Sequence, residues 1–353
     1  MIQKGSRAYQ ILEIVSMTGE VGEDAVTILI PQADYRKKLL QRLLQENKIV
    51  RYQKDGLKGY RLTISGKRWM LQCHAERFAY FLENGADATM RRSDFSHRSR
   101  QHRLAAVMSL FYLAGIEIFH DQKPEIFQPC ERIIRLRRSA FYSSMEWKNM
   151  GSLSTKIISS RAAGIWLTEC AVWFCYHLQG IHTWYGNIEK RADVVVRSLL
   201  QQHEYFFTST RALLFYDSET FGALEPKQYA HIRESPFEKF CYIPLDEKGS
   251  IVLQLLDDIE RYQYLYQVLT EDLEKSEDNT MIHDGYNDRK EPVLVCFDLD
   301  LKKLILFHLQ LKYAERTGEV ICFDFQKEEV EKICDAGIKV STVDLEAVRE
   351  LFF

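Results

Sequence analysis

Short apolar runs alternate with helical segments from Val293 to the C-terminus. Runs and helical segments follow one another in the order 293–297, 301–316, 320–323, 326–335, 338–343 and 345–352. Strands that alternate with helices pair in parallel through right-handed crossovers. Because the runs at 293–297 and 320–323 are continuously apolar, both faces of their sheet should be covered. The pattern predicts a parallel βαβα part at the C-terminal end.

Acidic residues follow the apolar runs of this part, at Asp298, Asp300, Asp324 and Asp344. The carboxyl ends of parallel strands are where ligands usually bind, so Asp298, Asp300 and Asp324 are candidates for a divalent-metal site. The alternative, which we favour, is that Asp300 and Asp344 cap the helices that follow them. There is no glycine-rich phosphate loop, which disfavours a nucleotide site of that kind.

The N-terminal segment has a different pattern, with three short helices followed by a hairpin. Ser6 is placed to cap the first helix, the second runs over about 23–29, and the third begins near Asp34. Alternating residues at 49–53 and 60–63 flank a turn that contains Asp55-Gly56. Asp-Gly between two alternating segments is a strong hairpin signal.

The stretch from Tyr35 to Trp69 resembles the winged helix-turn-helix family, with a basic third helix, a basic wing and a return strand Tyr60-Arg61-Leu62-Thr63. The resemblance implies a third helix in the DNA major groove and a wing on the backbone. From Asp34 to Arg68 there are 11 basic and 3 acidic residues, a balance that favours phosphate contacts. The candidate DNA-binding residues here are Arg36, Lys37, Gln41, Arg42, Lys54, Lys58 and Arg61. The alternative is a winged helix that contacts only protein.

The charge distribution supports DNA binding over a winged helix that contacts only protein. The 353-residue chain has a formal net charge of −3, which by itself argues against a nucleic-acid partner. Residues 1–104, however, hold 19 Lys and Arg against 11 Asp and Glu, a net charge of +8, and the remainder has a net charge of −11. Such asymmetry suggests a polyanion-binding end.

A second basic cluster follows the first. It contains Arg91, Arg92, Arg98, Arg100 and Arg103 together with His97 and His102. We expect a polar linker over Asp87–Ser99 and then a helix from Gln101 to Leu113. Arg98 and Arg100 are added to the candidate DNA-binding residues; a solvated linker and helix face is the alternative.

The sequence of the central region predicts further strands and helices, among them a hairpin of 164–168 with 171–176, a strand at 212–216, and helices at 184–201 and 220–234.

Within the central region, Glu146-Trp147-Lys148 matches the end of a nuclease motif in which carboxylates hold Mg²⁺ and a lysine polarises water. Asp121 or Glu125 would supply the second acid, so Asp121, Glu146 and Lys148 are the candidate catalytic residues. Ser143 and Glu146 also fit a capping box, which is the interpretation we favour.

A loose polar set accompanies this motif. Arg161, after Ser159-Ser160, would contact a phosphate or anchor a carboxylate, and Glu189 and Asp193 lie on the next predicted helix. The tyrosines Tyr142, Tyr176 and Tyr185 are better explained as core aromatics than as nucleophiles. None of these residues forms a recognisable active site.

The combination of these parts resembles proteins of the replication-relaxation type from mobile elements of Gram-positive bacteria, mainly over about the first 70 residues. The resemblance rests on Tyr60–Thr63, Gly66-Lys67-Arg68, Phe141–Ser144 and Ser160-Arg161. It implies a winged helix joined to an α/β domain of nuclease-like type. A clean Asp…Glu-x-Lys array is missing.

Composition places the chain among ordinary globular proteins, with 46% hydrophobic and 27% charged residues. We expect a cytoplasmic protein without a membrane span, because there is no signal-like N-terminus and no apolar run of about 18 residues. The eight cysteines lack C-x-x-C pairs, which favours reduced, buried thiols; a Cys170–Cys175 disulfide is the alternative.

These observations predict a multidomain α+β and α/β chain, with a winged helix at 1–85, a basic linker and helix at 86–115, a central α/β domain at 116–240 and a C-terminal α/β part at 241–353. The expected function is that of a DNA-binding protein of a plasmid or conjugative element, whose partners are double-stranded DNA and other mobile-element proteins. A metal-dependent nuclease or relaxase that uses Mg²⁺, Glu146 and Lys148 is one alternative. A protein-binding scaffold is the other, and no cofactor is otherwise expected.

Overall fold

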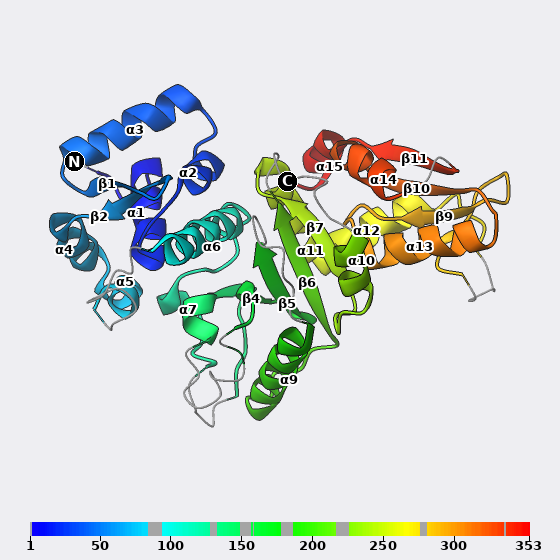
Figure 1. Cartoon of the computed structure of the whole chain (residues 1–353), viewed down its shortest axis with the longest axis horizontal. Coiled ribbons are helices and arrows are strands. Elements are labelled where there is room, and N and C mark those ends of the chain that lie inside the picture. The colour runs from blue at the N-terminus through cyan, green and yellow to red at the C-terminus, as the bar shows by residue number, and fades with distance from the viewer. Residues whose placement is uncertain are drawn as a thin grey trace.

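The structure, a computed structural model, describes residues 2–83, 94–127, 133–148, 157, 159–177, 186–216, 226–275, 281–334 and 337–353. It is a mixed α/β chain with a two-stranded, a five-stranded and a four-stranded sheet among the described residues. The N-terminal helices, the five-stranded sheet and the four-stranded sheet follow one another along the longest axis (Figure 1). The predicted mixed α/β class is therefore confirmed.

Three helices open the chain: α1 (Arg7–Thr18), α2 (Glu23–Leu29) and α3 (Ala33–Gln45). The Ser6 hydroxyl caps α1 as predicted, because it accepts a hydrogen bond from the Tyr9 amide at 3.3 Å. Only three residues separate α2 from α3, a connection typical of a helix-turn-helix pair.

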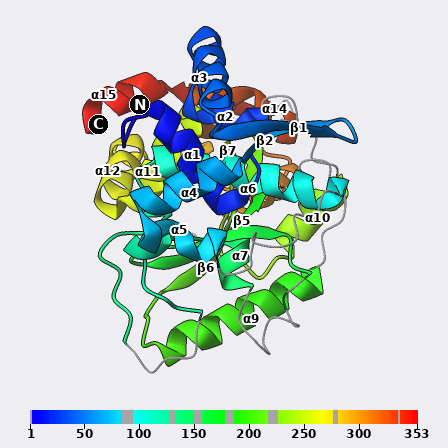
Figure 2. The ribbon, with the colours of Figure 1, turned by 90° about the vertical axis from the view of Figure 1, so that its left-hand side faces the viewer.

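The predicted hairpin follows, with β1 (Ile49–Lys54) antiparallel to β2 (Leu57–Leu62). Lys54 pairs with Leu57, so Asp55 and Gly56 alone form the turn. Their φ angles of 51° and 79° lie in the left-handed region, which the Asp-Gly sequence tolerates. Figure 2 shows the hairpin extending away from α1 and α4, with its turn at the edge of the molecule.

Helices α4 (Ile64–Cys73), α5 (Ala75–Leu82) and α6 (Phe95–Leu113) complete this end. Helix α6 packs on α1 and α2 and also on α11 and on strands β3, β4 and β5. The predicted linker over Asp87–Ser99 is wrong at its end, because α6 begins at Phe95 and is capped by the Asp94 carboxylate. Arg91 and Arg92 lie outside the described residues. Helix α6 shares one hydrophobic core with the N-terminal helices and with the five-stranded sheet.

The five-stranded sheet has its strands in chain order, β3-β4-β5-β6-β7. They are β3 (Ala140–Ser143), β4 (Ala162–Leu167), β5 (Ala171–His177), β6 (Ser209–Tyr216) and β7 (Phe240–Pro244). Strands β3, β4 and β5 form an antiparallel meander, which includes the predicted hairpin, and β5, β6 and β7 are parallel. Helices α9 (Gly186–Gln202) and α10 (Pro226–Arg233) make the two crossovers, and the short α7 (Ser144–Trp147) follows β3.

The two faces of this sheet belong to two hydrophobic clusters, because successive side chains of a strand point to opposite faces. Trp166, Trp173 and Phe215 pack with α6 and α11 on one face. Ile165 and Phe174 pack with apolar residues of α9 on the other. The sheet is thus the middle layer of three.

Residue 240, the predicted boundary, is the first residue of β7, the fifth strand of this sheet. Helix α11 (Glu247–Asp257) packs on β7 and α6 and so belongs to the same layered unit. Helix α12 (Ile259–Thr270) then leads toward the last sheet.

The four-stranded sheet has the order β11-β10-β9-β8. Its strands are β8 (Gly285–Tyr286), β9 (Pro292–Val295), β10 (Gly318–Phe323) and β11 (Ile338–Val343). Strands β9, β10 and β11 are parallel, which confirms the prediction, and β8 is an antiparallel edge. The helices of this part are α13 (Leu301–Tyr313), α14 (Lys327–Ile333) and α15 (Leu345–Phe352).

All seven cysteines that the structure describes are free thiols, so Cys170 and Cys175 do not form a disulfide; Cys130 lies outside the described residues. None of the described helices combines the length and the apolar composition that a bilayer crossing requires.

Candidate nucleic-acid interface

A groove of about 460 Å³ lies between α3 and the hairpin. We call it the α3–hairpin groove; it is lined by Glu23, Ala33, Arg36, Lys37, Leu40, Gln41, Leu44, Arg51, Lys58, Gly59 and Tyr60. Four of the predicted DNA-binding residues, Arg36, Lys37, Gln41 and Lys58, are thereby brought together from two elements. Arg51 is a groove cation that sequence reasoning missed, although its outward position on an alternating strand was a usable signal.

The cations of the groove are held in different ways. Arg36 donates to the carbonyl oxygens of Ile30 and Pro31 at 2.8 and 3.0 Å, so it closes the turn between α2 and α3. The Arg51 guanidinium lies over the Tyr60 ring, 5.8 Å from its centroid. Lys37 and Lys58 are exposed, and within the described part of the chain no carboxylate lies within ion-pair distance of either.

The other predicted cations of this region lie apart from the groove. Arg42 forms an exposed ion pair with Glu46 on α3, with 2.8 Å between Nε and Oε1. Lys54 is exposed beside the hairpin turn.

Arg61 and Arg98 are buried, which contradicts their prediction as phosphate contacts. Both donate to the carboxylate of Glu20, at 2.7 Å from Arg61 Nε and 2.7 Å from Arg98 Nη2. His102 Nε2 lies 2.8 Å from the same carboxylate. The side chains of Arg98 and Glu20 are fully buried. We call these four residues the Glu20 cluster.

The Glu20 cluster fixes the hairpin to α6. Arg98 also donates to the carbonyl oxygens of Lys54 and Leu57, on either side of the hairpin turn. A side chain at Gly59 would place its Cβ 2.3 Å from Glu20 Oε1, so glycine allows the carboxylate to lie against β2. Burial alone would raise the pKa of Glu20, but the hydrogen bonds from His102, Arg98 and Arg61 lower it to about 2. The carboxylate is therefore ionised throughout the ordinary pH range.

The three candidate catalytic residues do not converge. Glu146 completes the predicted capping box: its Oε2 accepts from the Ser143 amide at 2.7 Å. Its other oxygen lies 2.8 Å from the buried Lys123 ammonium. Asp121 is exposed and paired with Arg77, at 3.1 Å from Nε.

Lys148, the third of them, points elsewhere. Its ammonium group donates to the carbonyl oxygens of Ser160 and Ala162, at 2.7 and 3.1 Å. Glu189 accepts from the Ser160 hydroxyl at 2.8 Å and from the Arg161 amide at 2.9 Å. Arg161 and Glu189 thus belong together, as the loose polar set suggested, but Asp193 instead pairs with Arg197 at 3.0 Å.

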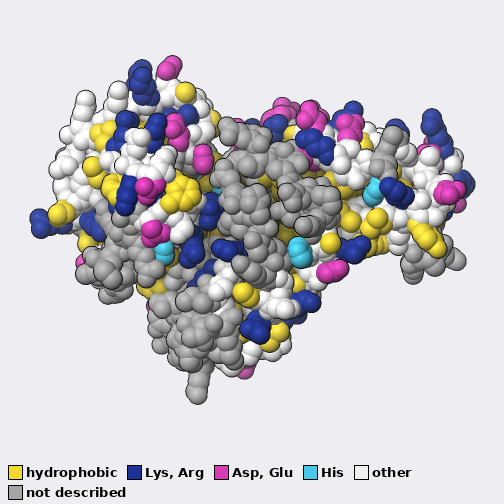
Figure 3. All heavy atoms as spheres, in the orientation of Figure 1, with side chains coloured by type: hydrophobic (Ala, Val, Ile, Leu, Met, Phe, Trp, Pro, Cys, Tyr) yellow, Lys and Arg dark blue, Asp and Glu magenta, His cyan; other side chains and the backbone are white. Residues whose placement is uncertain are grey.

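Lys148 and Arg161 line a second cavity, of about 500 Å³, between α6 and the start of β4. We call it the basic cavity; it is lined by His97, Arg100, Arg103, Leu104, Ser144, Lys148, Ser159, Ser160, Arg161, Ala162, Ala163, His177 and Ile188. Figure 3 shows Lys and Arg side chains gathered in a recess below α6. Arg100, predicted as a DNA contact, lies here and not at the α3–hairpin groove.

No family model, curated protein or solved structure matches this chain. Its function is therefore inferred from its own residues and their geometry.

Three of the four acidic residues that follow the C-terminal strands, Asp298, Asp300 and Asp344, have structural partners. Asp300 caps α13 and also accepts from the Phe240 amide at 3.0 Å, and Asp344 caps α15, as predicted. Asp298 is paired with Lys239 at 2.8 Å and accepts from the Tyr262 hydroxyl at 2.8 Å. These contacts join the two larger sheets. Among the described residues, no three His, Cys, Asp or Glu side chains are grouped as metal ligands.

Proposed function

We propose that residues 7–62 form a winged helix-turn-helix unit that binds double-stranded DNA through the α3–hairpin groove. In this proposal α3 enters the major groove and the hairpin lies along the backbone. The order of three helices and a hairpin supports it, as does the short turn between α2 and α3. The link to plasmid or conjugative elements rests on the sequence resemblance alone.

The observation that carries the proposal is that cations from two elements line one groove without an acidic partner. Lys37 comes from α3, and Arg51 and Lys58 come from the hairpin. In the part of the chain that the structure describes, none of the three is paired with a carboxylate. Exposed, unneutralised cations on a fixed scaffold suit phosphates, because binding releases the counterions of DNA.

Replacing Lys37 and Lys58 together with Ala is expected to weaken duplex binding at every sequence. The slope of log K against log salt should become shallower by about 2, since each lost phosphate contact contributes roughly 0.9. Fluorescence anisotropy with a labelled duplex at several salt concentrations measures this slope. Lys190→Ala, at an exposed position on α9, is the matched control and should leave it unchanged. If the double variant keeps the wild-type slope, the groove is not the binding surface.

Gln41→Ala should behave differently, because Gln41 is an exposed amide in the same groove. A Gln side chain pairs with adenine in the major groove, a contact worth about 1–3 kcal/mol of discrimination. We therefore expect an altered sequence preference and an unchanged salt slope, measured by selection from a randomised duplex library. An unchanged preference would exclude a base-reading role for this face of α3.

A further inference from the structure

The basic cavity gathers positive charge from segments far apart in the sequence. Arg100 and Arg103 come from α6, Lys148 follows α7, and Arg161 precedes β4. None of the described residues that line the cavity is an Asp or a Glu. Two acids lie beside the lining. Asp94 lies 3.9 Å from His97, and the fully buried Glu189 accepts hydrogen bonds from the Ser160 hydroxyl, the Arg161 amide and the Tyr176 hydroxyl. The cavity therefore carries a net positive charge.

The helical spacing of α6 separates this charge from the Glu20 cluster. Arg98 and His102, four residues apart, face Glu20 and the hairpin. His97, Arg100 and Arg103, each three residues apart, line the cavity instead. The positive charges on one face of α6 are thus neutralised by Glu20 inside the protein. The positive charges on the other face line the basic cavity.

The cations of the cavity destabilise one another's charged forms. Burial, together with Arg100 and Arg161, lowers the pKa of Arg103 to about 10. Burial and the same two arginines lower the pKa of Lys148 to about 7, against the opposing effect of Glu189. Groups kept in such a repulsive arrangement in a cavity are candidates for a functional site.

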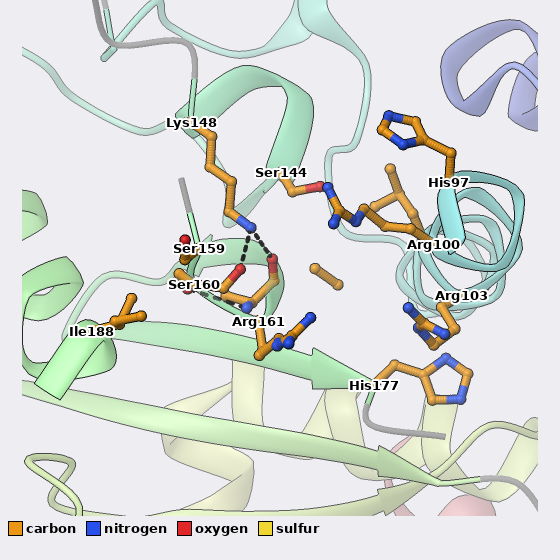
Figure 4. Close-up of a pocket in the computed structure, with 13 residues that line it drawn as sticks. His97, Arg100, Arg103, Ser144, Lys148, Ser159, Ser160, Arg161, His177 and Ile188 are labelled. Carbon is orange, nitrogen blue, oxygen red and sulfur yellow. Dashed lines mark hydrogen bonds between the residues drawn. The ribbon is translucent and has the colours of Figure 1, made fainter. Parts of the chain in front are cut away.

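The donors are arranged around a common space. In Figure 4 the guanidinium groups of Arg100 and Arg161 point from opposite sides into the space between α6 and β4. Arg103 and His177 lie next to each other at one end of this space, and Ser144 lies beside Arg100. Guanidinium groups bind phosphate oxygens in a bidentate manner, and a volume of about 500 Å³ accepts a small organic phosphate.

We propose that the basic cavity binds a phosphate group that carries two or more negative charges, as in a phosphomonoester or a diphosphate. Three guanidinium groups and an ammonium group match such an anion better than the single charge of an internal phosphodiester. The ligand is either a free phosphorylated compound or the 5′-terminal phosphate of a nucleic-acid strand. This site is separate from the α3–hairpin groove and does not depend on the proposed DNA binding.

The test is isothermal titration calorimetry of the full chain with inorganic pyrophosphate at low salt. We expect saturable binding to one site, weakened at least tenfold by Arg100→Gln and by Arg103→Gln. Lys37→Ala, which changes only the α3–hairpin groove, is the matched control and should bind as the wild type does. Absence of saturable binding, or equal binding by the arginine variants, would overturn the proposal.

Two further competition experiments identify the source of the phosphate. Adenosine monophosphate and a short single strand with a 5′-phosphate are each competed against pyrophosphate, beside the same strand with a 5′-hydroxyl. Competition by the monophosphate indicates a free ligand, and competition by the 5′-phosphorylated strand alone indicates a strand end. Equal competition by the 5′-hydroxyl strand would contradict the requirement for a doubly charged group.

Thermal unfolding of the unliganded variants separates a binding role from a structural one. Because burial and the neighbouring Arg100 and Arg161 all disfavour the charge of Arg103, Arg103→Gln should unfold at the wild-type temperature or above it. If Arg103→Gln does not fold, Arg103→Lys keeps the charge and should retain pyrophosphate binding. A folded Arg103→Lys variant without binding, together with an Arg100→Gln variant that binds normally, would also reject the site.

Sulfate provides a probe of Lys148, because it is a dianion that does not itself titrate near neutral pH. Lys148 is faced by Arg100, Arg161 and Glu189 and by the carbonyl oxygens of Ser160 and Ala162. A bound dianion should raise the pKa of Lys148 from about 7, so sulfate binding at pH 8 should take up a proton. Calorimetry in two buffers of different ionisation enthalpy measures the uptake, which should vanish in Lys148→Met. Proton uptake that persists in this variant would exclude Lys148 from the site.

Discussion

Replacing Glu20 by Gln is expected to lower the free energy of unfolding by about 3–5 kcal/mol. The substitution keeps the shape of the side chain but leaves the buried guanidinium groups of Arg61 and Arg98 without a counter-charge. Removing one partner of a buried ion pair has this effect, because the remaining charge stays out of water without compensation. Denaturant unfolding at pH 7, followed by tryptophan fluorescence, measures the loss.

The same carboxylate predicts a dependence of stability on pH. The pKa of Glu20 is about 2 in the folded protein and near its ordinary value of 4.5 in the unfolded chain. Its contribution to stability is therefore fully present above pH 4.5 and is lost as the pH falls from 4.5 toward 2. The shift corresponds to about 3 kcal/mol, so the difference between wild type and Glu20→Gln should shrink by this amount across that interval.

The matched control is Glu46→Gln. Glu46 also pairs with an arginine, Arg42, but on the exposed surface of α3, where such a pair contributes less than about 1 kcal/mol. A Glu20→Gln variant that is no less stable than Glu46→Gln would show that the Glu20 cluster does not hold the hairpin to α6.

The elements of the fold that are determined locally could be predicted from the sequence. The Asp55-Gly56 turn is one example, since both residues adopt positive φ angles that few other pairs tolerate. The parallel pairing of β9 and β10 is another, because their apolar runs favour a sheet that is covered on both faces. The cap at Asp300 and the capping box at Ser143 likewise depend on neighbours only a few residues away.

The start of α6 could not be predicted in the same way. Its first turns contain His97, Arg98 and Arg100, which gave the appearance of a solvated linker. Arg98 is nevertheless fully buried, because its charge is compensated by Glu20, 78 residues earlier in the chain. A local pattern carries no information about such a partner, so a buried arginine and a phosphate-binding arginine look alike in the sequence.

The basic cavity was missed for a related reason. Its cations come from α6, from the end of α7 and from the start of β4, and they meet only because α6 packs on β4 and β5. The sequence distinguishes Lys148 only by its spacing from Glu146. In the structure the two side chains have different partners and do not form a joint site. For Arg161 the sequence predicts a phosphate contact or a carboxylate anchor, and only the fold shows which residues surround it.

Glu146→Gln is the second substitution for which we expect a large effect, again a loss of about 3–5 kcal/mol in the free energy of unfolding. Burial alone would raise the pKa of Glu146, but Lys123 and His120 outweigh it and lower the pKa, so the group is a carboxylate. The side chains of Glu146 and Lys123 are 5% and 1% exposed. Glutamine can still accept from the Ser143 amide, but it leaves the Lys123 ammonium buried without a counter-charge.

A double-mutant cycle separates the ion pair from the capping box. Lys123→Met alone should also be destabilising, because it leaves Glu146 buried as an unpaired carboxylate. The double variant should lose about 2–3 kcal/mol less than the sum of the two single losses, since neither charge then remains. Glu125→Gln is the control: Glu125 lies 3.4 Å from the other side of His120, but it is exposed, so its loss should matter little.

The cycle also decides between the two interpretations of the Glu-x-Lys sequence. A carboxylate that serves metal-dependent cleavage is repelled by the other carboxylates of the metal site. Replacing it with a neutral side chain therefore leaves the free energy of unfolding unchanged or raises it, while activity is lost. A carboxylate that neutralises Lys123 and closes the turn after β3 has the opposite effect, and its removal costs stability first. A Glu146→Gln variant as stable as the wild type would restore the nuclease alternative. A variant that is destabilised, and whose stability is restored in part by Lys123→Met, would show that Glu146 stabilises the fold. Glu146 would then have no part in the proposed phosphate site of the basic cavity.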